Sequence, residues 1–205
     1  DSSTIDIETA QATYAAAKAA GFDMIDAPVS GGVTGADAGT LTFMCGGDKK
    51  TFEKAKPILQ GMGKNIIHCG NAGLGQVTKI CNNMLAGINA LAAAEVMVMG
   101  ERLGVSPETL YNVISTSTGR SYIFENSNPM PGVSATSPAN NNFKPGFMAK
   151  LMLKDLRLSQ AAAQSASTST PLGAVATASF QQLIENGFGD YDTSSIIKVI
   201  DPKLK

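Results

Sequence analysis

Several residue types are scarce in this 205-residue chain, and each scarcity excludes a class of protein. Tryptophan is absent. Histidine occurs once, as His68, so catalysis by a Ser-His-Asp triad is not expected. Three cysteines without a CxxC spacing predict neither a disulfide framework nor a zinc site, and we expect no metal. The cysteines are interpreted as reduced thiols in a cytosol-like compartment.

Charge is also sparse, and it is balanced. The chain has 16 Lys and Arg against 17 Asp and Glu, which gives a formal charge of −1. This balance argues against nucleic acid or an anionic membrane as a partner. The longest uncharged run, residues 80–94, has fifteen residues and falls short of the ~20 apolar residues of a membrane span. A hydrophobic content of 43% nevertheless predicts a folded chain of about one to two domains.

The apolar pattern changes near residue 70. Before it, helical and strand patterns alternate, with helices predicted at 5–20 and 49–59, strands at 22–29, 40–45 and 65–69, and a loop at 30–35. After it, only helices are predicted, at 75–102, 107–115, 147–166, 172–186 and 193–200, with a loop over 116–146. We therefore predict an α/β domain at 1–70 and an all-α domain at 71–205.

The predicted helix at 75–102 is the longest in the chain, about 28 residues or about 42 Å. Apolar residues recur every three or four positions, small residues cover the other faces, and no charge lies between Lys79 and Glu95. Such a helix is expected to be buried nearly all round. Helices of this kind lie between domains or between subunits, so we expect a homodimer or homotetramer.

Lys79 is a candidate catalytic residue because it lies one turn into this uncharged helix. The helix N-terminus and burial both lower the pKa of a lysine toward the range of an acid/base catalyst. Asn83 follows four residues later on the same face, where its amide can hold a substrate oxygen. The spacing is equally compatible with a lysine that reaches solvent at the helix end.

Ser30, Gly31 and Gly32 follow a predicted strand and form a candidate anion-binding loop. Glycine allows backbone N–H groups to converge on a carboxylate without a Cβ in the way. Two adjacent glycines more commonly indicate a tight turn. The glycines at 70, 73 and 75 are in the reverse order of a G-x-G-x-x-G dinucleotide loop, so that interpretation is rejected.

Four motifs, in order and spacing, resemble those of the β-hydroxyacid dehydrogenases. They are Asp26-Ala-Pro-Val-Ser-Gly-Gly-Val, Gly39-Thr-Leu-Thr-Phe-Met, Gly73-Leu-Gly-Gln-Val-Thr-Lys-Ile-Cys-Asn-Asn83 and Lys154-Asp155-Leu-Arg-Leu. Residues 128–133 and 138–141 are similar to the 3-hydroxyisobutyrate dehydrogenases in particular. This resemblance implies oxidation of 3-hydroxyisobutyrate to methylmalonate semialdehyde with NAD, in valine catabolism. The composition is consistent with bacterial cytoplasm, or with the mitochondrial matrix in a eukaryote.

The resemblance also assigns residues and a fold. It makes Lys79 the catalytic lysine, Asn83 and the Ser30–Gly31–Gly32 loop substrate-binding, and Thr4 and Lys154 cofactor-binding. The implied fold is an α/β remnant of a Rossmann-like cofactor domain followed by an all-α domain like the C-terminal domain of 6-phosphogluconate dehydrogenase. Because the family's N-terminal G-x-G-x-x-G unit is not in this sequence, we expect a C-terminal portion that by itself binds NAD weakly or not at all, as calorimetry would show.

Other functions remain open at this level. A glyoxylate, succinic semialdehyde or tartronate semialdehyde reductase of the same family is one alternative. Phosphogluconate dehydrogenase is less favoured, because Asn82 stands where that relative has a catalytic histidine. A non-catalytic helical dimerisation module would explain the long helix alone, but such a module gains nothing from a buried Lys79.

Overall fold

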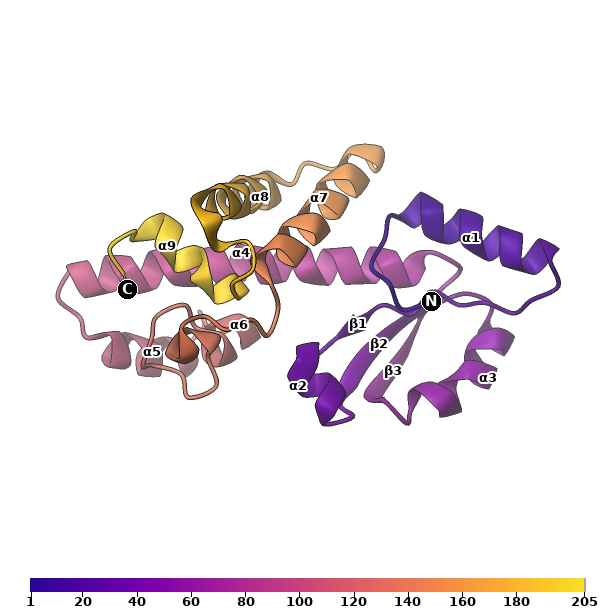
Figure 1. Ribbon diagram of the computed structural model, residues 1–205, viewed down its shortest axis with the longest axis horizontal. Coiled ribbons are helices and arrows are strands. Elements are labelled where there is room, and N and C mark those ends of the chain that lie inside the picture. The colour runs from indigo at the N-terminus through magenta and orange to yellow at the C-terminus, as the bar shows by residue number, and fades with distance from the viewer. Residues whose placement is uncertain (205) are drawn as a thin grey trace. The chain divides into compact units, whose positions relative to one another are not determined.

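Figure 1 shows the computed structural model, which describes residues 1–204. The chain divides into two compact units. The first contains Asp1–Asn82 and Ala161–Thr168, and the second contains Asn83–Gln160 and the chain from Ser169 onward. The division falls within the long helix α4 (Leu74–Arg102), so this helix contributes to both units.

The first unit is built on a three-stranded sheet in the order β1–β2–β3. The strands are β1 (Val29–Ser30), β2 (Leu41–Gly46) and β3 (Gly63–Gly70). β1 pairs antiparallel with β2, and β2 pairs parallel with β3, so that β2, α3 (Lys49–Leu59) and β3 form a βαβ unit. The core of this unit consists of Ile25, Ala27, Phe43, Cys45, Phe52 and Leu59.

Two local predictions in this unit are wrong. The strand predicted at 22–29 is reduced to an isolated bridge between Asp26 and Gly46 and to the two residues of β1. Pro28 between them has no N–H to donate to a ladder, which explains the interruption. The loop predicted at 30–35 contains a short helix, α2 (Gly32–Asp37), because Gly31 and Gly32 adopt positive φ values at its start.

The second unit is helical. Its elements pack against part of the surface of α4, which contributes buried residues to their core (Figure 1). They are α5 (Pro107–Ser115), α6 (Tyr122–Asn126), the 3-10 turn η1 (Pro138–Asn141), α7 (Ala149–Ser165) up to Gln160, α8 (Pro171–Leu183), the π turn η2 (Ile184–Phe188), the 3-10 turn η3 (Thr193–Ile196) and α9 (Ile197–Ile200). Short helical turns thus occur inside the segment predicted as loop at 116–146.

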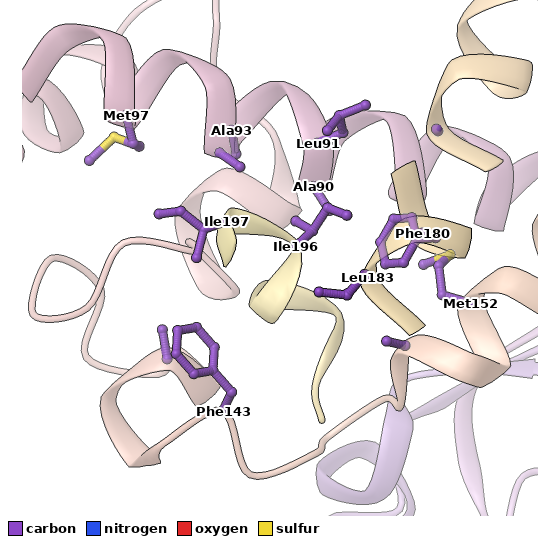
Figure 2. Close-up of a cluster of buried hydrophobic side chains, with 14 of the residues drawn as sticks. Ala90, Leu91, Ala93, Met97, Phe143, Met152, Phe180, Leu183, Ile196 and Ile197 are labelled. Atoms are coloured by element: carbon purple, nitrogen blue, oxygen red, sulfur yellow. The ribbon is translucent and has the colours of Figure 1, made fainter. Parts of the chain in front are cut away.

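Figure 2 shows how this core is assembled from segments far apart in the sequence. Ala90, Ala93 and Met97 of α4 face Phe180 and Leu183 from α8 and Ile196 and Ile197 from the C-terminal turns. Small residues on α4 let these bulky side chains approach its backbone, and Gly87 lies against Leu156 for the same reason.

The expectation that α4 is buried all round is wrong. Its outer face exposes Leu85 and Met99, each 58% accessible, and Leu103 just beyond its end. The whole of α4 is long and apolar enough to meet the criteria for a membrane span, although its uncharged run alone was too short. However, 50% of its most apolar window is buried inside the protein, as in the core helix of a folded domain.

Candidate functional site

The N-terminus of α4 is held by a buried carboxylate. Asp26 accepts hydrogen bonds from the backbone N–H of Gly73 to Oδ1 at 2.7 Å and from the N–H of Gln76 to Oδ2 at 3.0 Å. These N–H groups have no acceptor within the helix, and the negative charge lies at the positive end of the helix dipole. A Cβ on Gly75 would overlap the Met44 carbonyl oxygen, so glycine allows this close approach of α4 to the sheet.

Lys79 lies on the second turn of this anchored helix. Only 7% of the residue is accessible, so the structure excludes the interpretation in which Lys79 simply extends into solvent. Asn83 lies four residues further along α4 and is also buried. Residues at this spacing lie above one another on one face of a helix, so both polar side chains share a face.

Asn83 is oriented by a residue from another helix. Its Nδ2 donates a 2.5 Å hydrogen bond to Oδ2 of Asp155 on α7. The other carboxylate oxygen, Oδ1, lies 3.0 Å from the Lys154 ammonium, whose side chain is partly exposed. Asp155 itself is 2% accessible, so one buried carboxylate links Asn83 and Lys154 within the second unit.

Thr4 lies in a segment held by another buried side chain of α4. The amide of Gln76 accepts a hydrogen bond from the N–H of Ile5 at 3.2 Å and donates one to the carbonyl of Ser3 at 2.8 Å. Gln76 is fully buried. The backbone on both sides of Thr4 is therefore tied to the helix that carries Lys79.

The predicted carboxylate loop lies at the end of β1. Ser30 is the last residue of that strand, and Gly31 and Gly32 are exposed with φ values of 131° and 60°. L-residues with a side chain rarely adopt these conformations. The backbone of Gly31 and Gly32 is therefore exposed and held in conformations that favour glycine.

The sequence-predicted residues are therefore distributed over both units. Lys79, Thr4 and the Ser30–Gly32 loop lie in the first, whereas Asn83 and Lys154 lie in the second, where Asp155 joins them. Sequence reasoning missed Asp155 as a buried partner, because an adjacent charged pair within a helix usually faces solvent. Its spacing from buried Met152 and Ser159 could have placed it on the inner face of α7.

The polar groups of this chain are compatible with NAD. A threonine on an anchored backbone and a partly exposed lysine are donors of the kind that the amide, ribose and phosphate groups of a dinucleotide use. Among the described residues, 1–204, no group of three His, Cys, Asp or Glu side chains could hold a metal ion.

Comparisons with known proteins extend over nearly the whole chain. Residues 1–70 match a family described as the NAD binding domain of 6-phosphogluconate dehydrogenase. Residues 73–200 match one described as NAD-binding of NADP-dependent 3-hydroxyisobutyrate dehydrogenase. These matches confirm the predicted fold class, a Rossmann-like remnant followed by a helical domain.

Individual relatives agree with the family matches. NAD-dependent L-serine dehydrogenase of Pseudomonas aeruginosa is 44% identical over 98% of this chain and 67% of its own length. A probable mitochondrial 3-hydroxyisobutyrate dehydrogenase of Dictyostelium discoideum is 43% identical over 100% of this chain and 64% of its own. The solved structure of Mycobacterium tuberculosis 3-hydroxyisobutyrate dehydrogenase with L-serine superposes with a TM-score of 0.93 at 44% identity, covering 98% of this chain and 69% of that one. The chain thus spans about two thirds of the length of these relatives.

Proposed function

Because the chain belongs to the 3-hydroxyisobutyrate dehydrogenase family of oxidoreductases, we propose that it forms part of an NAD-dependent enzyme that oxidises 3-hydroxyisobutyrate to methylmalonate semialdehyde in valine catabolism. The observation that carries this proposal is the buried Lys79, one turn from Asn83 on an anchored helix. A lysine held at a fixed position on such a helix can take the proton of a substrate hydroxyl when its amine is neutral.

The chain supplies the acid/base chemistry. The neutral amine of Lys79 takes the proton of the substrate hydroxyl, and in the reverse direction its ammonium returns that proton to the carbonyl oxygen. Bound NAD supplies the acceptor for the hydride that leaves the carbinol carbon. Asn83 binds the same substrate oxygen, and its hydrogen bond to Asp155 fixes the orientation of its amide.

The remaining site residues bind the ends of the two ligands. The backbone N–H groups of Ser30, Gly31 and Gly32 bind the substrate carboxylate. Thr4 and Lys154 contact NAD. The positive φ values at Gly31 and Gly32 and the two hydrogen bonds that flank Thr4 support these roles.

The test is NAD-dependent oxidation of 3-hydroxyisobutyrate by the product of the complete gene, with Lys79→Ala beside wild type. We expect a loss of about 10²–10⁴ in kcat, which is the usual contribution of a positioned acid/base group. Lys150→Ala removes an exposed lysine paired with Asp190 and serves as the matched control. A folded Lys79→Ala enzyme, checked by circular dichroism, that keeps wild-type kcat would refute the role of Lys79.

L-Serine is a second candidate substrate. It shares a carboxylate and a 3-hydroxyl with 3-hydroxyisobutyrate, and a 44% identical relative is named an L-serine dehydrogenase. Comparing kcat/KM for the two acids decides between them. Reduction of glyoxylate, succinic semialdehyde or tartronate semialdehyde without oxidation of either acid would replace the proposed substrate and retain the family.

We also propose that the protein forms a homodimer or homotetramer through the outer face of α4. That face consists of Leu85, Ala92, Met99 and Leu103, which are all exposed. Glu95 is also exposed between Ala92 and Met99, but the large apolar side chains along this face favour contact with another protein surface. For the location, we propose bacterial cytoplasm, or the mitochondrial matrix if the source is a eukaryote.

A further inference from the structure

Gln76 is a fully buried amide on α4 whose hydrogen bonds reach across 71 and 73 residues of sequence. We propose that Gln76 is a positioning residue for cofactor binding, which fixes Thr4 relative to the helix that carries Lys79. This inference rests on the proposed function, because it assigns Thr4 to the cofactor and Lys79 to the substrate hydroxyl.

The pattern of the two hydrogen bonds shows what they fix. Gln76 accepts from the residue after Thr4 and donates to the residue before it, as the C=O and N–H of one residue in a parallel neighbouring strand would. In an extended segment those two groups point to one side, whereas the N–H and C=O of the residue between them point to the other. One side chain thereby determines the direction in which Thr4 presents its polar groups.

Gln76 is itself held at its backbone. Its N–H donates to Oδ2 of Asp26, which also accepts from Gly73 at the start of α4. The amide is thus attached to a rigid helix end, three residues before Lys79 and on the same face. A displacement of the Thr4 backbone relative to α4 requires that both part-buried hydrogen bonds break, so that the carbonyl of Ser3 and the N–H of Ile5 lose their partner on α4.

If Gln76 only filled space in the core, its two side-chain hydrogen bonds would not be needed. A methionine has nearly the shape of glutamine and would fill the same volume without donating or accepting in this way. Gln76→Met therefore separates packing from positioning. Gln76→Glu keeps an acceptor for the N–H of Ile5 but loses the donor for the carbonyl of Ser3, and it provides a partial variant.

The experiment uses the product of the complete gene and NADH as the probe. We measure the Kd of NADH by its fluorescence, the amide hydrogen exchange rate of Ile5, and KM for the hydroxy acid. In Gln76→Met we expect the Kd to rise about tenfold, exchange at Ile5 to accelerate at least tenfold, and KM for the acid to stay within about twofold. In Gln76→Glu we expect a smaller rise in Kd and retained protection of Ile5.

Asn128→Leu is the matched control. Asn128 is also a fully buried amide that bridges two backbone groups, the carbonyl of Phe124 and the N–H of Met130, but in the second unit. The Asn128→Leu variant should have a lower Tm than wild type and an unchanged Kd for NADH. A folded Gln76→Met protein whose Kd stays within twofold of wild type would show that Gln76 only supports the fold.

The inference and the proposed function fail differently. If wild type binds NADH but oxidises no 3-hydroxy acid, the proposed function is wrong and the ratio of Kd values still decides the role of Gln76. If wild type binds no NADH, both are wrong. If Gln76→Met does not fold, Gln76→Glu decides by the same Kd and exchange measurements.

Discussion

Replacing Asp155 tests whether one buried carboxylate organises the polar groups of the second unit. Asp155→Leu removes the acceptor of the 2.5 Å bond from Asn83 and the counter-ion 3.0 Å from Lys154. The buried amide of Asn83 then lacks that partner, which costs about 1–3 kcal/mol. The Lys154 ammonium is partly exposed and can be hydrated, so it adds little to this cost.

The net expectation for Asp155→Leu is a loss of about 1–3 kcal/mol in the free energy of unfolding, measured by urea denaturation with circular dichroism. Asp155→Asn retains an oxygen acceptor for Asn83 and should lose less than about 1 kcal/mol. In steady-state kinetics of the complete gene product, Asp155→Leu should lower kcat/KM for the hydroxy acid about ten- to a hundredfold, since Asn83 is no longer oriented.

Two results would refute this reasoning. An unchanged urea midpoint in Asp155→Leu would show that the bond to Asn83 contributes no net stability. A kcat/KM within twofold of wild type in a folded Asp155→Leu enzyme would show that the orientation of Asn83 does not matter for turnover. The comparison with Asp155→Asn separates the loss of the hydrogen bond from the loss of charge.

Three further predictions concern the core, a thiol and the exposed helix face. Phe180→Ala removes a fully buried ring, so the free energy of unfolding should fall by about 3–5 kcal/mol and Tm by roughly 6–20 °C in calorimetry. A decrease in Tm of less than about 3 °C would contradict the packing shown in Figure 2. Burial raises the pKa of the Cys45 thiol to about 11. At pH 8 a thiol reagent should therefore label the partly exposed Cys69 in the folded protein but label Cys45 only after unfolding, and labelling of Cys45 in the folded protein would contradict this expectation. Leu85→Glu should reduce the oligomer size in light scattering, whereas Ile58→Glu, at an exposed site on α3, should not; an unchanged size in Leu85→Glu would exclude the proposed contact.

The sequence predicted the features that depend on local periodicity. The long helix was predicted at 75–102 and spans Leu74–Arg102, and the helix predicted at 49–59 has those same bounds. Repeats of three to four residues report the spacing within one helix, so no distant contact is needed to recognise them. Lys79 could be singled out for the same reason, because the absence of charge around it is a local property.

Only the tertiary structure decided which side chains are buried together. Asn83 and Asp155 lie 72 residues apart in the sequence, and Gln76 is separated from Ser3 and Ile5 by similar numbers of residues. No local sequence pattern can predict such contacts. The exposed Leu85 illustrates the converse case. Its apolar neighbours predicted a helix buried all round, but the elements of the second unit cover only part of α4, because burial depends on which segments the rest of the chain can bring to each face.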